Sequence, residues 1–522
     1  MHDSQRLAVE HVWRLEEEGV ELIRDGSFLA VVGDDEYQVI QAAERLARTA
    51  TWDGTTINAS DLYEQLTSNA RESRPVVDGM PQDVPVPPLH EPPANAALTH
   101  AARYDKPYIM HGSIGPSAAA AEVDRGGGLK IWTHSQGIQP LKTSISEALG
   151  IPPDNVLIQH VPGAGCYGHN GADDAAFDAA LVALALPGRP VLLKWTRDDE
   201  HAWEPYASAM SMELRASLDA EGAVIDWSHE SYSDTHLGRP RPTLGGEGSS
   251  RLLAALHRGN PAPPFLPNLS MARHAGLHRN IDPYYTFPAV RAIKNLVRDL
   301  PLRTSALRCL GGYANIFALE SMMDELASKI EVDPVTFRLR HLDDPRAHDV
   351  IEAAAAGIGW SRDRDDAVGH GIAFSRYCNS KTYAAIAIEL TVNDKAEIEI
   401  RKVVCAADAG EVVDAAGLRM QLEGGILQAI SWTLYEEVLF DQDGITSRDW
   451  DTYPILTFAQ APPVDVIIID RPGEAHLGAG EASSEPVAAA IANALFDAVG
   501  IRVRRLPMTP NNLRQVAMCP DG

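Results

Sequence analysis

The chain of 522 residues contains few cysteines, and they are scattered along it: Cys166, Cys309, Cys378, Cys405 and Cys519. No two of them have the close spacing of a zinc or iron–sulfur motif, which excludes a metal cluster bound by cysteines of this chain. Such sparse use of cysteine also suits a reducing compartment, so we expect a cytoplasmic protein.

Long hydrophobic runs are also absent. No stretch of about 18 apolar residues occurs, so we expect no membrane-spanning segment. The first residues, MHDSQRLAVEHVWRLEEEG, carry acidic side chains and no apolar segment, and therefore do not form a signal peptide.

Positive charge is scarce. The sequence has 45 lysines and arginines but 72 aspartates and glutamates, which gives a formal net charge of -27. Nucleic acid and anionic membranes would repel such a chain, so both are excluded as main partners. Any anionic ligand must therefore be held by local backbone amides or by individually placed arginines.

What remains is typical of a globular protein, with 45% hydrophobic and 22% charged residues. The length predicts two or three domains. We assign residues 1–65 to a partial small α+β domain, because the strand SFLAVVG precedes a helix at 34–47 that Asp34 or Asp35 would cap. The polar and then proline-rich residues 66–100 indicate a connector. Residues 101–350 and 351–522 mix strands and helices and form two larger domains.

Two segments, 163–195 and 478–507, echo each other, since both run from Gly-Ala-Gly into an alanine-rich helix, a turn and a strand. Glycines let a backbone approach a ligand, and the first amides of a helix attract anions, so the pair could hold a phosphate-bearing cofactor. Ordinary loop-to-helix turns are the alternative. Each helix should bury one face, formed by Phe177, Leu181 and Leu184 in the first and by Val487, Ile491, Leu495 and Val499 in the second.

Glu481 follows the glycines of the second loop. Pro486 suits the first position of the helix, which makes Glu485 the expected cap and puts Glu481 a full turn earlier. A carboxylate held there out of water could take a proton at neutral pH, so Glu481 is a candidate acid/base group. A solvated turn residue is the alternative.

Several stretches, in one order along residues 25–515, resemble a known family: IWTHSQG, GAGCYGHNGADDAAFDAALVALALPGRPVLLKW, PLRTSALRCLGGYANIFALESMMDELA, MQLEGGILQAISWTLYEEV and LGAGEASSEPVAAAIANALFDAVGIRVRRLP. The family is the molybdopterin-binding large subunit of xanthine dehydrogenase and aldehyde oxidase, on the branch of isoquinoline and nicotinate dehydrogenases. The resemblance implies an α+β, multi-domain molybdenum-cofactor-binding fold, with two elongated α/β domains after the small N-terminal fragment.

The resemblance also implies roles for single residues. Glu481 matches the family's general base, while the expected cofactor-binding residues are Gln136, Gly165, Cys166, Tyr167, Gly168, Arg308, Gln421 and Gly480. No side chain is expected to ligate the metal, which the pterin holds in this family. Taken singly, each residue has a structural alternative, such as an ion pair for Arg308. His111 could line the substrate side, although a structural hydrogen bond is the more common role of a lone histidine.

The activity implied is hydroxylation of an electron-poor carbon in an N-heteroaromatic, nicotinate-like substrate or an aldehyde, with oxygen from water. Electrons would pass to a separate small [2Fe–2S] subunit and then to a flavin or cytochrome acceptor, and the pterin would carry a cytosine nucleotide. The family's N-terminal GQG element is not found in this sequence. We expect that a companion chain supplies it, that the gene start is misplaced, or that the chain is a remnant that no longer holds the cofactor. Two alternatives stay open: a non-catalytic scaffold or cofactor carrier derived from the family, and an acidic hydrolase using Glu481 with Glu485.

Overall fold

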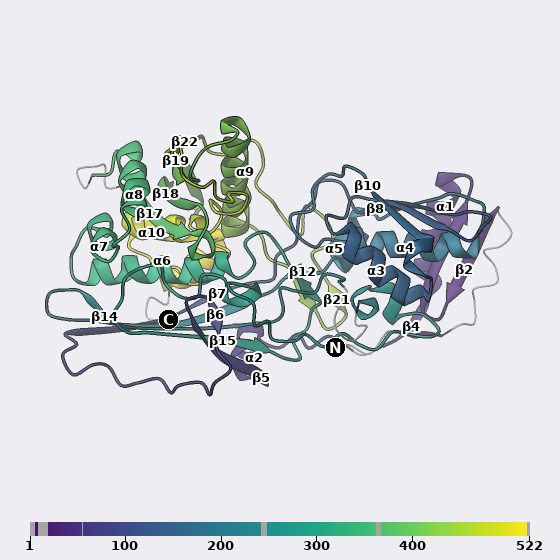
Figure 1. The fold of residues 1–522 in the computed structure, drawn as a ribbon, viewed down its shortest axis with the longest axis horizontal. Coiled ribbons are helices and arrows are strands. Elements are labelled where there is room, and N and C mark those ends of the chain that lie inside the picture. The colour runs from purple at the N-terminus through teal and green to yellow at the C-terminus, as the bar shows by residue number, and fades with distance from the viewer. Residues whose placement is uncertain (1–5, 9–18, 55, 242–247, 362–366, 519–522) are drawn as a thin grey trace.

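The computed structural model describes residues 6–8, 19–54, 56–241, 248–361 and 367–518. Cys519 and most of the first nineteen residues quoted above lie outside this part of the chain. Figure 1 shows two lobes. One holds a six-stranded sheet beneath a helix-covered four-stranded sheet, and the other holds a second four-stranded sheet beside the N-terminal elements.

The six-stranded sheet has the order β6-β5-β15-β14-β13-β7. Its strands are β5 (Arg71–Val77), β6 (Met80–Pro81), β7 (Leu98–Lys106), β13 (Met210–Leu218), β14 (Val224–Ser233) and β15 (Val290–Val297). The expectation of a connector at 66–100 was therefore wrong for its first part, because β5 pairs antiparallel with β15. That pairing joins residues more than two hundred positions apart, whereas the proline-rich composition reports only on the stretch that follows β6.

The sheet of the smaller lobe has the order β10-β9-β8-β11 and a hydrophobic core of its own. Its strands are β8 (Ala118–Val123), β9 (Leu129–Thr133), β10 (Val156–His160) and β11 (Val191–Lys194), and its helices are α3 (Ile138–Leu149) and α4 (Ala172–Ala185). Next to it lie β2 (Val20–Asp25), β3 (Phe28–Gly33) and α1 (Glu36–Thr49). Asp35 caps α1 by accepting a hydrogen bond from the Gln38 amide, as predicted.

The third sheet has the order β17-β18-β19-β22. Its strands are β17 (Val368–Arg376), β18 (Tyr383–Val392), β19 (Ile398–Asp408) and β22 (Val464–Ile468). The helices around it are α6 (Gly312–Lys329), α7 (Pro334–Arg340), α8 (Pro345–Ile358), α9 (Ala415–Leu434), α10 (Val487–Val499) and α11 (Pro510–Met518). Helix α6 packs against β7, β13, β17 and α10, so one core joins this sheet to the six-stranded sheet (Figure 1). The boundary expected at 350 falls inside α8.

The remaining elements are short. They are β1 (Arg6–Ala8), β4 (Thr51–Asp53), α2 (Leu62–Ser68), α5 (Arg197–Trp203), β12 (Tyr206–Ala207), β16 (Thr304–Ser305), β20 (Phe440–Asp441) and β21 (Gly444–Ile445), with five 3-10 turns between them in the described residues. Of the helices described, none is both long and apolar enough to cross a membrane.

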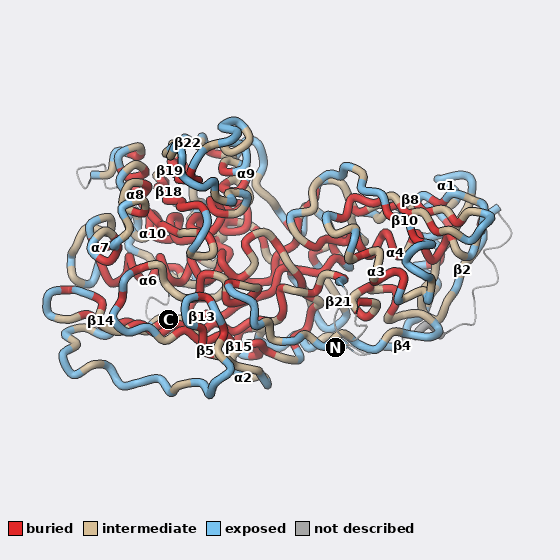
Figure 2. Tube along the Cα trace, viewed as in Figure 1, coloured by how far each residue is buried: buried red, intermediate tan, exposed pale blue. Residues whose placement is uncertain are grey.

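The two echoing helices differ from expectation in their burial. Residues Val487 to Leu495 of α10 are all buried, and so is most of α4, so neither helix buries only one face (Figure 2). Alanine permits this because it fits against neighbours on every side. The strand expected after α10 does not form. The β-pairing of residues 501–508 is limited to an isolated bridge between Asp105 and Arg505.

Close packing of α10 on β17 depends on glycine. A Cβ atom added to Gly371 would lie 2.1 Å from the Ala490 carbonyl oxygen and 2.2 Å from the Ala494 nitrogen. Both are backbone atoms of α10, so the helix itself would have to move away from the strand.

We predict that Gly371→Ala lowers the free energy of unfolding by about 1–3 kcal/mol, the usual effect of overpacking. Gly424→Ala is the matched control, because Gly424 is exposed on α9 and its added Cβ meets nothing within 4 Å. The control should be neutral or more stable by about 0.5–1 kcal/mol. Chemical denaturation measures both, and equal effects of the two substitutions would contradict the packing described.

Candidate active site

Arg308 connects the two glycine loops. Its backbone amide donates to the Tyr167 carbonyl oxygen at 2.7 Å, and its Nε donates to the Gly480 carbonyl oxygen at 2.8 Å. Gly168 also forms a backbone bridge with Leu307. The loops that echo each other in sequence therefore lie on two sides of residues 306–308.

The first loop takes its shape from glycine. Gly165 and Gly168 have φ angles of 114° and 141°, which side-chain-bearing residues rarely adopt. A Cβ atom on Gly168 would lie 2.0 Å from the Ala306 carbonyl oxygen. Tyr167 extends from this turn and is exposed. The loop therefore packs tightly on residues 306–307, and the Tyr167 ring lies against Gly165.

Helix α9 holds the second loop. The hydroxyls of Ser483 and Ser484 donate to the Leu422 and Gly425 carbonyl oxygens, both at 2.9 Å. Arg308 reaches the same helix, since its Nη2 donates to the Gln421 carbonyl oxygen at 3.1 Å. Its Nη1 donates to Gln428 Oε1 at 3.2 Å. Arg308, Gln421 and Gly480, predicted from three separate motifs, thus lie together.

Gln136 is exposed at the start of α3, near the first loop. Its backbone amide interacts with the Cys166 thiol, whose pKa is raised by burial. The thiol donates to the Gly168 carbonyl oxygen at 3.0 Å, and Arg239 hydrogen-bonds to the same oxygen. Cys166 therefore closes the loop as a neutral thiol.

Glu481 lies where the loops meet. Its Oε1 accepts a hydrogen bond from the Cys309 backbone amide at 2.9 Å. Its Oε2 accepts one from the Tyr377 hydroxyl and lies 3.5 Å from Arg279 Nη1. The side chain keeps 35% of its surface exposed, so Glu481 is fixed in place but a ligand can reach it.

Arg279, Cys309 and Tyr377 were not predicted as site residues. Tyr377 directly follows β17, Arg279 ends a 3-10 turn, and Cys309 contributes through its backbone at a φ of 74°. The sequence near Cys309 offered one signal, because Leu310, Gly311 and Gly312 follow it before α6 and indicate a tight turn. Arg279 and Tyr377 carry no comparable local signal.

Glu485 does not cap α10. Pro486 occupies the cap position without a side-chain cap bond, and α10 begins at Val487. The Glu485 side chain instead turns inward and is fully buried, and neither carboxyl oxygen has a hydrogen-bond partner among the described residues. Burial raises its pKa to about 8; Arg279 opposes this shift and Glu481 adds to it. Glu485 is therefore a neutral acid at pH 7.

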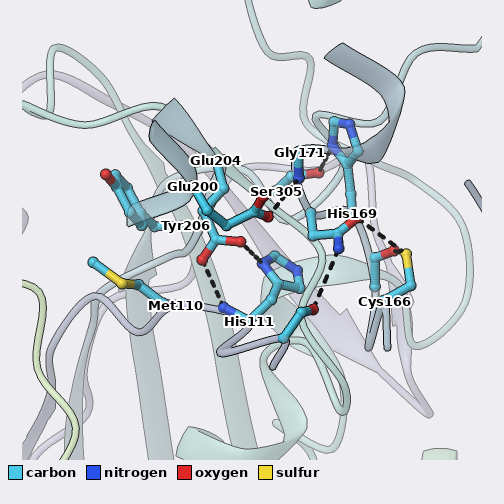
Figure 3. Close-up of polar contacts among 12 residues, drawn as sticks. Met110, His111, Cys166, His169, Gly171, Glu200, Glu204, Tyr206 and Ser305 are labelled. Atoms are coloured by element: carbon cyan, nitrogen blue, oxygen red, sulfur yellow. Dashed lines mark hydrogen bonds and ion pairs between the residues drawn. The ribbon is translucent and has the colours of Figure 1, made fainter. Parts of the chain in front are cut away.

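His111 has a structural role behind the first loop (Figure 3). Its backbone amide donates to Glu204 Oε1 at 2.7 Å, and its Nδ1 lies 3.2 Å from Glu204 Oε2. Its Nε2 lies 2.9 Å from the Ala306 carbonyl oxygen. Burial, together with the charge of Glu204, raises the pKa of the adjacent Glu200 to about 7. Through Ala306, this network supports residues 306–308. These contacts fit a structural hydrogen-bonding role for His111.

Family profiles for molybdopterin cofactor-binding domains match residues 90–238 and 265–342 in one case and residues 314–462 in the other, together more than half of the chain. The chain belongs to the molybdopterin-binding subunits of the xanthine dehydrogenase family. The resemblance seen in the sequence is confirmed.

Curated relatives of this molybdopterin-binding chain include a nicotinate dehydrogenase subunit of Pseudomonas putida, 35% identical over 95% of the chain and 41% of the relative. The beta subunit of isoquinoline 1-oxidoreductase from Brevundimonas diminuta is 26% identical over 77% of the chain and 49% of the relative. The chain thus spans less than half the length of these two relatives.

Solved structures agree on the fold. Quinoline 2-oxidoreductase from Pseudomonas putida 86 matches with a TM-score of 0.77 at 13% identity, over 98% of this chain and 92% of that one. Aldehyde oxidoreductase from Desulfovibrio gigas matches with a TM-score of 0.72 at 16% identity, over 93% of this chain and 68% of that one. The α+β, multi-domain fold of a molybdopterin-binding chain was therefore predicted correctly.

The residues at the two loops suit a molybdopterin. Amide side chains, a guanidinium and an open glycine backbone are the donors and acceptors that a pterin and its phosphate can use. In the described ranges, no group of three His, Cys, Asp or Glu side chains could hold a metal ion.

We predict that Glu485→Gln changes the pH dependence of stability. A carboxyl whose pKa rises from 4.5 to about 8 on folding stabilises the protein fully below pH 4.5 and loses that contribution as pH rises towards 8. Glutamine does not titrate, so the stability of Glu485→Gln relative to wild type should increase by up to about 1.4 kcal/mol per pH unit in this window.

Unfolding measured from pH 5 to pH 8 tests this expectation. Glu474→Gln is the control, because Glu474 is exposed and its replacement should leave a flat difference. A constant difference for Glu485→Gln across the same range would mean that Glu485 is already ionised in the folded protein.

Proposed function

We propose that the chain is the catalytic molybdenum subunit of a hydroxylase that acts on an electron-poor carbon of an N-heteroaromatic, nicotinate-like substrate or an aldehyde, with water as the oxygen source. One observation supports this most directly. Glu481 combines a fixed orientation with partial exposure at the junction of the two glycine loops. The relative named nicotinate dehydrogenase supports the substrate class.

The cofactor would be held by the residues around Arg308. Gln421 and Arg308 offer hydrogen-bonding groups from one side, and Gln136 with the Gly165–Gly168 backbone offers them from the other. When bound, a molybdenum cofactor supplies Lewis-acid and two-electron redox chemistry. The protein supplies binding, orientation and the transfer of a proton.

Glu481 would take the proton. Oε1 accepts one hydrogen bond, from the Cys309 amide, whereas Oε2 already faces both Tyr377 and Arg279. A carboxylate oxygen can accept two hydrogen bonds, so Oε1 is the oxygen that would accept the proton. Tyr377 and Arg279 stabilise negative charge on Oε2 before the transfer. General bases placed in this way accelerate reactions by about 100-fold to 10,000-fold.

The proposal extends to partners. Electrons would leave to a small [2Fe–2S] subunit and then to a flavin or cytochrome acceptor in the cytoplasm, and the pterin would be the cytosine dinucleotide form. Two relatives are named as subunits, which supports a multi-chain complex.

We predict that Glu481→Gln lowers acceptor-dependent oxidation of nicotinate at least about 100-fold, because glutamine cannot accept the proton. The protein is produced with its partner subunits in a host that makes molybdenum cofactor. Molybdenum per chain is measured beside the rate and should stay at the wild-type value, since the Glu481 side chain is not needed to hold the cofactor.

Glu474→Gln, an exposed replacement, controls for the loss of one negative charge. Equal rates in wild type and Glu481→Gln would remove Glu481 from the mechanism. Wild-type complex without molybdenum would favour the scaffold or carrier alternative.

A further inference from the structure

A chain with a net charge of -27 needs local positive charge to bind an anion. Beside Glu481 that charge is Arg279, whose guanidinium contacts both Glu481 and Tyr377. Arg308, the other arginine next to the loop, is engaged with Gly480, Gln421 and Gln428. Since the proposed function assigns Arg308 to the cofactor, Arg279 is the arginine beside Glu481 that is left for a substrate.

The hydrogen bonds of Arg279 leave one nitrogen unused. Nε donates to the His274 carbonyl oxygen at 3.1 Å, and Nη1 faces Tyr377 and Glu481. No hydrogen-bond partner of Nη2 lies among the described residues, and Nη2 is not one of their buried, unpaired atoms. Nη2 is thus open to solvent on a side chain that is itself only 15% exposed.

The position of Arg279 is rigid. The next residue, Asn280, donates to the Arg376 carbonyl oxygen at 2.9 Å and accepts from the Cys378 amide at 2.9 Å. Asn280, Cys378 and Asn379 all have φ angles near 50°, which cost energy and persist only where surrounding contacts impose them. The guanidinium carbon also lies 5.1 Å from the centre of the Tyr377 ring. Arg279 and Tyr377 therefore form a preorganised pair.

We propose that Arg279, positioned by Tyr377, binds a carboxylate on the substrate, so that the site selects heteroaromatic carboxylates over neutral heterocycles. This inference rests on the proposed function. A planar guanidinium forms strong, charge-assisted hydrogen bonds with carboxylates. Because Nη1 of the same group faces Glu481 Oε2, a carboxylate on Nη2 brings the attached ring next to the base.

The charges around Arg279 agree with this role. Glu481 is the one carboxylate whose oxygen the described structure puts in an ion pair with it, and buried Glu485 is neutral at pH 7. Asp282 is nearby in sequence, but its carboxylate accepts a hydrogen bond from Asn379. Arg279 forms an ion pair with only one carboxylate, so its guanidinium can still attract the carboxylate of a substrate.

The test compares nicotinate with nicotinamide, which share a ring and differ by one negative charge. In the assembled complex, Arg279→Gln should raise KM and the calorimetric Kd for nicotinate about 100-fold, the scale of a lost charge-assisted pair. The Kd for nicotinamide should change less than about threefold, because it has no charge to lose. Arg279→Lys should recover part of the nicotinate affinity, since it keeps the charge but not the planar fork.

Arg340→Gln, at the exposed end of α7, is the matched control and should leave both ligands unaffected. Equal losses for nicotinate and nicotinamide would overturn the inference, because Arg279 would then act only through Glu481. Wild-type complex that oxidises neutral heterocycles but binds nicotinate no better than nicotinamide would overturn it as well, while leaving the proposed function intact. Loaded wild-type complex that oxidises no heterocycle or aldehyde would overturn both.

Discussion

The site depends on Arg308, which carries hydrogen bonds in two directions. Its backbone amide fixes Tyr167 in the first loop, and its guanidinium fixes the carbonyl of Gly480 in the second. A charged donor to a carbonyl makes a stronger bond than a neutral one, and here it joins loops that follow strands of different sheets, β10 and β22. The neighbouring residues add the Gly168–Leu307 bridge and the hydrogen bond from the Cys309 amide to Glu481, so residues 307–309 together anchor both loops.

The core behind the site explains why the loops can stay open. Helix α10 is buried along nine consecutive residues, and its contact with β17 is close enough to exclude even one methyl group at Gly371. Rigid packing of this kind lets a functional loop remain partly exposed, because the helix behind it does not shift. Ser483 and Ser484 add two hydrogen bonds to α9, so the turn that carries Glu481 is held from both ends.

Local sequence signals predicted much of this arrangement. The strand β3, the helix α1 with its Asp35 cap, and the alanine-rich helices α4 and α10 follow from capping residues and from periodicity. The order of motifs along the chain indicated the fold, and the predicted Gln421, Arg308 and Gly480 are found together. Contacts between distant segments could not be predicted in this way: β5 pairs with β15, and Tyr377 reaches Glu481 across 104 positions. The prediction that Glu485 caps α10 was wrong for a related reason: capping rules consider only the helix and not the buried space beside it.

Burial keeps Glu485 uncharged, and this affects the site because Glu485 lies close to Arg279. Arg279 interacts electrostatically with both glutamates, but only Glu481 reaches it as an ion pair. Were both ionised, two negative charges would share one guanidinium, and its attraction for a further anion would weaken. Because burial keeps the Glu485 pKa near 8, the proton stays on the inner carboxyl at neutral pH, and the charge of Arg279 is directed outwards. An acidic chain can thus present the positive charge of Arg279 to a ligand, provided that the Glu485 carboxyl stays buried and neutral.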